Sequence, residues 1–209
     1  LTFNLQAVKK IAKNSKIMAV LKANAYGHGL VETVKAIKSV EGIAILTIEE
    51  AVKIRKAGFK NTILLLEGLF AAEDIHQAEK LNLNIVVHND QQMDFLGDVT
   101  LKNPINVHLK INTGMNRLGF EVKDFLEIYD KYLHDKDFTL MSHLSASNIP
   151  NDPSNNEQFE RFDSLVSKLH SNVSKSIANT GCVINFPEKS FDWVRVGIGI
   201  FGGYIGNND

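Results

Sequence analysis

A lysine stands at the end of an apolar run in the stretch VLKANAYGHG, residues 20–29. An amine at the inner end of a strand is partly withdrawn from water and lies near other cations, and both effects lower its pKa. A neutral lysine amine is a nucleophile that forms an imine with an aldehyde or ketone. Lys22 is therefore a candidate catalytic residue. The same pattern also fits a lysine whose stem packs while its ammonium group reaches water.

The residues after Lys22 form a predicted turn before a helix that begins near Leu30. Gly27 and Gly29 allow backbone N–H groups to approach an anion, and the Tyr26 hydroxyl can donate to a phosphate. No GxxxxGK[ST] or GxGxxG pattern accompanies these glycines, so nucleotide-binding motifs are not supported. His28 has no second His, Cys or carboxylate at ligand spacing, and we predict no metal site here.

A second polar loop, NTGMNRLGF at residues 112–120, follows the apolar run INVHLKI. Its threonine, two glycines and arginine suggest a structured loop that aims Arg117 inward, although a solvated loop arginine is the commoner case. Lys110 ends the preceding run and would place a second cation close by. Because two uncompensated cations repel, we expect a counter-charge or a chemical change on Lys110.

The elements that position these residues follow from the alternation of apolar runs with segments of helical spacing. Strand followed by helix, repeated, indicates a parallel sheet, and runs that are almost continuously apolar suit strands covered on both faces. About eight such units predict a (β/α)8 TIM barrel of α/β class, with an open doubly wound sheet as the alternative. The predicted strands are residues 17–22, 43–46, 63–66, 84–88, 105–111, 138–144, 176–179 and 193–197, and the clearest helices are 48–58, 71–81, 123–133 and 156–170.

In barrels of this kind the active site lies at the C-terminal ends of the strands. Cationic and hydrogen-bonding groups stand at these ends, with few carboxylates among them, so the predicted ligand is an anion. The candidates are Lys22, Asn24, Tyr26, Lys110, Arg117, His143, Asn179, Thr180, Arg195 and Gly197.

Composition narrows the class of protein further. A formal net charge of -1 over 209 residues offers no basic surplus for nucleic acid, and no apolar stretch approaches membrane-spanning length. The single cysteine, Cys182, forms no internal disulfide and suits a reducing compartment. We predict one domain over residues 1–209, located in the cytoplasm.

Three motifs together resemble the alanine racemases of bacteria. VLKANAYGHG resembles their pyridoxal-phosphate lysine motif, LKINTGMNRLGF their second signature, and FDWVRVGIGIFG their strand-eight segment, in the same order. The resemblance implies the barrel and pyridoxal 5'-phosphate as cofactor. It also implies the interconversion of L-alanine and D-alanine through an aldimine, which supplies D-alanine for peptidoglycan synthesis.

The resemblance also implies roles for individual residues. Lys22 would carry the cofactor and act as the base on one face of the substrate. Arg117 would lie near the phenolic oxygen and the substrate carboxylate, and Lys110 would be carbamylated. The remaining cofactor contacts would be Tyr26, Asn179, Thr180, Gly197 and Ile198 at the phosphate, His143 against the ring and Arg195 at the pyridine nitrogen.

Racemisation needs a second base on the opposite face of Cα. In this family a tyrosine from the C-terminal β-domain of the other subunit of a homodimer provides it. We expect that domain to be absent from this chain and the chain to be inactive or nearly so, because Tyr129, Tyr132 and Tyr204 match no such motif. A serine racemase and a non-catalytic single-domain pyridoxal-phosphate-binding protein are the alternatives.

Two positions depart from the family pattern. Thr180-Gly181-Cys182 stands where serine and alanines are usual, and Val196 stands where proline is usual. Threonine keeps the hydroxyl donor. Valine relaxes the backbone constraint at the phosphate turn, and Cys182 fits a small buried filler better than a nucleophile.

Overall fold

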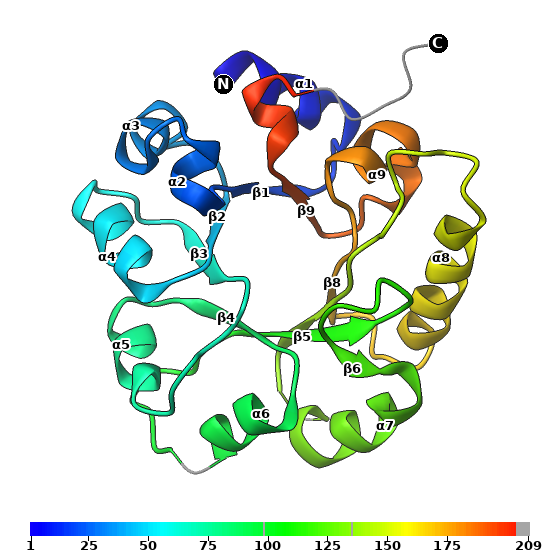
Figure 1. Ribbon diagram of the computed structural model, residues 1–209. Coiled ribbons are helices and arrows are strands. Elements are labelled where there is room, and N and C mark those ends of the chain that lie inside the picture. Colours follow the sequence, from blue (N-terminus) through cyan, green and yellow to red (C-terminus); the bar gives the residue numbers. More distant parts are fainter. Residues whose placement is uncertain (98, 135, 204–209) are drawn as a thin grey trace.

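Eight parallel strands form a ring with helices around its outside (Figure 1). The computed structural model describes residues 1–97, 99–134 and 136–203, so Tyr204 lies outside the described residues. The ring order is β8-β7-β5-β4-β3-β2-β1-β9. Its strands are β1 (Lys16–Val20), β2 (Gly42–Ile45), β3 (Thr62–Leu65), β4 (Asn84–Val87), β5 (Val107–Asn112), β7 (Phe138–Met141), β8 (Ser174–Ser176) and β9 (Trp193–Val196). The predicted barrel is confirmed.

The ring closes between β8 and β9 through individual hydrogen bonds. The Ser176 hydroxyl donates to the Trp193 carbonyl at 3.0 Å, and the Arg195 N–H donates to the Ala178 carbonyl at 2.9 Å. On the other side, β9 pairs in parallel with β1, with Met18 opposite Arg195 and Ala19 opposite Val196. The strand thus passes regularly through Val196, the position that departs from the family pattern.

The helices around the strands are α1 (Thr2–Ile11), α3 (Leu30–Ala36), α4 (Ile48–Lys56), α5 (Asp74–Lys80), α6 (Asp90–Gly97), α7 (Phe125–Ile128), α8 (Pro153–Val166) and α9 (Thr180–Asn185). The short segment α2 (Lys22–Tyr26) follows β1 and is a left-handed turn. The predicted helix at 123–133 is divided into a 3-10 turn, α7 and a wider turn at Tyr129–Leu133. None of the described helices combines the length and the apolar character needed to cross a membrane.

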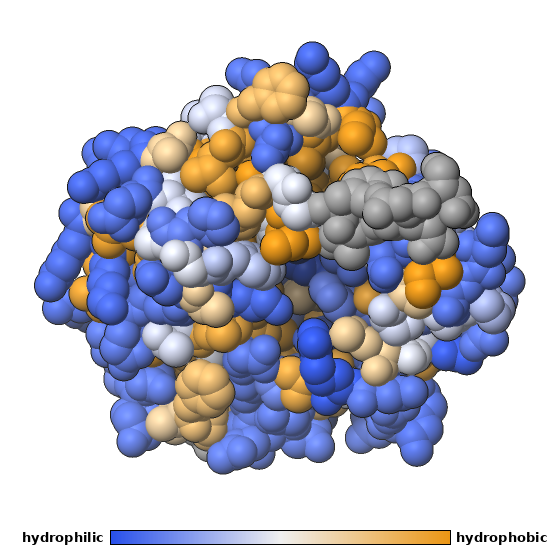
Figure 2. All heavy atoms as spheres, turned by 45° about the horizontal axis from the view of Figure 1, so that its top comes forward, coloured by the Kyte–Doolittle hydropathy of each residue, from blue (hydrophilic) through white to orange (hydrophobic). Residues whose placement is uncertain are grey.

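Strand side chains alternate between two apolar layers, which explains the nearly continuous apolar runs. Ile17 and Ala19 pack outward against the helices, whereas Met18 and Val20 join a separate cluster with Ala44, Leu64, Val86, Met141 and Trp193 inside the barrel. Hydrophilic residues dominate most of the outline in Figure 2, and hydrophobic residues show as separate patches between them.

Candidate active site

A pocket of about 480 Å³ opens where the barrel strands give way to loops. Its lining includes Lys22, Tyr26, Lys110, Arg117, His143, Asn179, Thr180, Arg195, Gly197 and Ile198. The structure therefore brings together every residue that the sequence assigned to cofactor or substrate. The roles of these residues remain predictions.

The turn that carries Lys22 and Tyr26 is left-handed. Ala23, Asn24, Ala25 and Tyr26 have φ between 52° and 56°, a conformation that costs L-residues roughly 1–2 kcal/mol each. The Asn24 side-chain oxygen accepts the Leu30 N–H at 2.9 Å and fixes the turn to the start of α3. Consequently both side chains reach the same pocket, with the Lys22 Nζ 6.0 Å from the centre of the Tyr26 ring.

The Tyr26 hydroxyl lies over a backbone that has no room for a side chain. A β-carbon on Gly197 would overlap this hydroxyl, and one on Gly199 would lie 2.5 Å from Thr180 Cγ2. The Gly197 N–H donates to Thr180 Oγ1 at 3.3 Å. Burial raises the pKa of Tyr26, so its phenol stays protonated as a donor. Two hydroxyl groups and a tight glycine turn thus face one end of the pocket.

Asn179 lines the pocket and also holds the backbone around it. Its side-chain oxygen accepts the Ser147 hydroxyl at 2.6 Å and the Cys182 N–H at 3.0 Å. The amide therefore caps α9 and fixes the turn that contains Thr180. From these contacts, Asn179 supports the lining of the pocket through the backbone.

Arg195 is buried in the barrel and held by the ends of two neighbouring strands. Its Nη1 donates to the Ser176 carbonyl at 2.9 Å and its Nη2 to the Ser142 carbonyl at 2.6 Å. Burial lowers the pKa of Arg195 to about 10, which still leaves it protonated at neutral pH. The guanidinium is therefore a fixed cation whose orientation is set by the protein.

His143 lies against that guanidinium. The Arg195 Nη2 is 3.2 Å from His143 Nδ1, and because arginine only donates, Nδ1 accepts and the ring proton belongs on Nε2. Burial, followed by the charges of Arg195, Lys110, Arg117 and Lys22, lowers the pKa of His143 well below its usual value. His143 is therefore a neutral imidazole.

The amine withdrawn from water is Lys110, whereas Lys22 is exposed. This corrects the expectation that Lys22 is partly withdrawn from water. Burial, then the charges of Arg195 and Arg117, lower the pKa of Lys110 to about 8, while Glu67 opposes this shift. Of the two buried cations, Lys110 and Arg195, Lys110 loses its proton more easily, because its pKa is about 8 and that of Arg195 is about 10.

Glu67 is a pocket residue that the sequence analysis missed. It is the second residue after β3, and it is the one carboxylate among the described lining residues, which carry four cationic side chains. The rule that selected the other strand ends would have found it had the run ILLL been extended by one residue. The apolar lining residues Val20, Leu46, Leu66, Leu118 and Met141 were also missed.

The family model described as "Alanine racemase, N-terminal domain" matches residues 1–205. The chain belongs to this family.

Relatives and solved structures of this family agree with the assignment. The alanine racemases of Nitrosomonas eutropha and Nitrosospira multiformis are 35% and 38% identical over 97% and 95% of this chain. The crystal structure of biosynthetic alanine racemase from Pseudomonas aeruginosa superimposes with a TM-score of 0.92 and 32% identity over 100% of this chain and 59% of its own. The chain spans 57% and 56% of the two curated relatives.

Proposed function

We propose that this chain is the cofactor-binding barrel of an alanine racemase, with pyridoxal 5'-phosphate bound in the pocket at the strand ends. The observation that carries the proposal is the joint presence of Lys22, three further cationic side chains and the Tyr26 and Thr180 hydroxyls around one cavity. An anionic aldehyde needs this combination, because cations and donors hold its phosphate while an amine reaches its carbonyl.

The donors present fit that cofactor. The glycine turn at Gly197 admits the Tyr26 hydroxyl only because no β-carbon is there, and Thr180 Oγ1 already accepts from the Gly197 N–H. The Thr180 hydroxyl proton can therefore point toward a phosphate. With the Gly197 and Ile198 backbone, these groups would hold the phosphate, and the volume of the pocket suits a ligand of this size.

The other pocket residues would orient the substrate and move its proton. When bound, pyridoxal phosphate supplies an aldehyde that binds amines and a ring that withdraws electrons from Cα. Lys22 would remove or return the Cα proton on one face. Arg117 would bind the substrate carboxylate, and the protonated Arg195 would face the pyridine nitrogen and keep it unprotonated.

Lys110 is proposed to be carbamylated. A neutral lysine amine adds to carbon dioxide and loses one proton, which leaves a carboxylate on Nζ. A pKa of about 8 makes the neutral amine far more abundant near neutral pH than the ordinary lysine value would, and the new anion would lie beside Arg117 and Arg195. Mass spectrometry of the native chain in bicarbonate would detect the added carboxylate, and a bare amine there would remove this part of the proposal.

The base for the opposite face of Cα is proposed to come from a C-terminal β-domain of the partner subunit in a cytoplasmic homodimer that supplies D-alanine for peptidoglycan. We expect the 209-residue chain alone to racemise alanine barely or not at all. A coupled assay that follows D-alanine tests this, and rapid turnover by the purified chain would contradict it. L-serine in the same assay tests the choice of alanine.

Cofactor binding is tested by mixing the purified chain with pyridoxal 5'-phosphate and recording its absorption spectrum. We expect a new band from the joined amine and aldehyde, which borohydride fixes and which peptide mass mapping assigns to Lys22. Lys22→Ala is the control and should lose the label. No band in the unaltered chain, or a label spread over surface lysines, would refute the cofactor assignment.

A further inference from the structure

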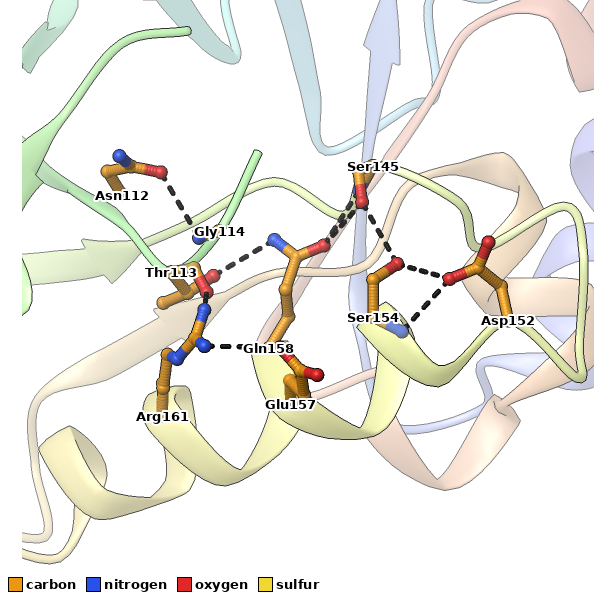
Figure 3. Close-up of polar contacts among 9 residues, drawn as sticks. All are labelled: Asn112, Thr113, Gly114, Ser145, Asp152, Ser154, Glu157, Gln158 and Arg161. Atoms are coloured by element: carbon orange, nitrogen blue, oxygen red, sulfur yellow. Dashed lines mark hydrogen bonds and ion pairs between the residues drawn. The ribbon is translucent and has the colours of Figure 1, made fainter. Parts of the chain in front are cut away.

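One buried glutamine links two of the loops that form the pocket. Gln158 lies on α8, is 1% exposed, and points from the helix toward the strand ends (Figure 3). Its Nε2 donates to Thr113 Oγ1 at 3.2 Å and to the His143 carbonyl at 3.0 Å. Its Oε1 accepts the Ser145 N–H and the Ser145 hydroxyl, each at 2.9 Å. Both donors and both acceptor sites of the amide are therefore used.

The contacts of Gln158 continue to the pocket residues. The Thr113 and Ser142 hydroxyls are 2.7 Å apart, and Ser142 Oγ donates to the Ile111 carbonyl at 2.8 Å. Ser142 also offers its carbonyl to Arg195 at 2.6 Å. The loop that leads to Arg117 and the loop that begins at His143 thus share one connected set of hydrogen bonds.

A second side chain of α8 fixes the same loop. Arg161 donates from Nη1 to the Thr113 carbonyl at 2.8 Å (Figure 3). A β-carbon on Gly114 would lie 2.8 Å from this nitrogen, so the loop passes directly against α8. Because Thr113 is held through both its hydroxyl and its carbonyl, Gln158 acts on a loop that has little freedom to move away.

We propose that Gln158 is a positioning residue, which sets the Arg117 loop and the backbone of His143 relative to each other for cofactor binding. The inference rests on the proposed function. Gln158 lies behind the lining of the pocket and acts through Thr113 and His143. A primary amide is suited to this place because it donates twice and accepts twice, whereas an apolar side chain would remove all four of these hydrogen bonds.

The test compares Gln158→Met with Asn155→Leu. Asn155 is a matched control because it lies on the same helix, is also 1% exposed, and donates only to the far part of the loop, at Ala146 and Ile149. We expect Gln158→Met to weaken the binding of pyridoxal 5'-phosphate by about tenfold to hundredfold, since small displacements of binding groups have effects of this size. Asn155→Leu should stay within about twofold of the unaltered chain.

A second readout does not need the cofactor. Nitrogen NMR of His143 should show the Nε2–H tautomer in the unaltered chain and in Asn155→Leu, and a mixture of tautomers in Gln158→Met. Purely structural support would lower stability and leave the tautomer unchanged. If Gln158→Met does not fold, Thr113→Val replaces that variant in both measurements, because it removes the hydroxyl that joins the two loops.

The outcomes separate the two proposals. The positioning role is overturned if Gln158→Met binds the cofactor as tightly as the unaltered chain and keeps the same His143 tautomer. It is also overturned if Asn155→Leu loses as much cofactor affinity as Gln158→Met. If the unaltered chain binds no pyridoxal phosphate, the proposed function fails, and the His143 tautomer alone decides whether Gln158 positions that residue.

Discussion

At the scale of single residues, environment distinguishes side chains of the same type. Lys22 and Lys110 line one pocket, yet Lys22 is exposed and Lys110 is only 5% exposed. The two are suited to different tasks because an accessible amine can join an aldehyde, whereas a buried amine between cations is under pressure to lose its proton. Residue type alone does not reveal this difference.

The buried charge of Lys110 predicts a stability that depends on pH. Its pKa is about 8 in the folded chain against 10.5 ordinarily, so between these values the unfolded chain binds more protons and stability rises with pH. In buffer free of carbon dioxide, Lys110→Met should raise the free energy of unfolding at pH 7 by up to about 3 kcal/mol. Urea titrations should show this gain shrinking from pH 8 to 10.5. Lys60→Met, at an exposed position, is the control. A gain in the free energy of unfolding of Lys110→Met that does not change with pH would contradict the prediction.

Gly197 predicts a steric effect on cofactor binding. In Gly197→Ala the new methyl group would overlap the Tyr26 hydroxyl and displace it. We expect the affinity for pyridoxal phosphate to fall about tenfold, because overpacking of this kind costs about 1–3 kcal/mol. Fluorescence titration measures the affinity. Gly97→Ala, where a β-carbon meets nothing within 4 Å, should bind pyridoxal phosphate with unchanged affinity. Unchanged affinity in Gly197→Ala would show that the close approach of Tyr26 to Gly197 does not matter for cofactor binding.

At the scale of elements, the sequence predicted where α3 begins but not the hand of the turn before it. Ala23, Asn24, Ala25 and Tyr26 contain no glycine, so local preferences favour a right-handed turn. The left-handed form is held by contacts formed only in the folded chain, such as the Asn24 bond to Leu30. Its place beside Lys22 is typical of strain retained at functional sites.

This turn predicts an inverted response to glycine. Ala23 is exposed with φ of 52°, so Ala23→Gly removes a strain of roughly 1–2 kcal/mol at an entropic cost of about 0.5–1 kcal/mol. The free energy of unfolding should stay level or rise by up to about 1 kcal/mol. In the exposed middle of the right-handed α1, Ala7→Gly should instead lower it by about 1 kcal/mol. Equal losses in the two urea titrations would contradict a strained left-handed turn.

At the scale of the whole molecule, the apolar runs were sufficient to predict the barrel, because eight strands covered on both faces leave a strong pattern. The ends of the strands were predicted less well. β1 ends at Val20, whereas the predicted strand continued to residue 22, and β8 covers Ser174–Ser176, whereas the predicted strand was 176–179. The contacts of Gln158 were beyond prediction, since they join residues 45 positions apart through buried polar atoms. Such pairings leave no local pattern in the chain.

The uneven distribution of charge over the molecule predicts ligand-linked stability. The chain has a formal net charge of only -1, yet four cations and one carboxylate line the pocket, which should attract a phosphate. At about a hundredfold excess over Kd, pyridoxal 5'-phosphate should stabilise the chain by about 2.7 kcal/mol and raise Tm by about 5–10 °C.

Pyridoxal, which has the aldehyde but no phosphate, should give a much smaller rise in Tm at the same concentration. Thr180→Val should bring the effect of the phosphate form closer to that of pyridoxal, because it removes a hydroxyl that faces the pocket. Added salt should reduce the phosphate-dependent part of the shift, since it screens the cations. Equal shifts with both compounds in calorimetry would show that the charges around the pocket do not select the phosphate.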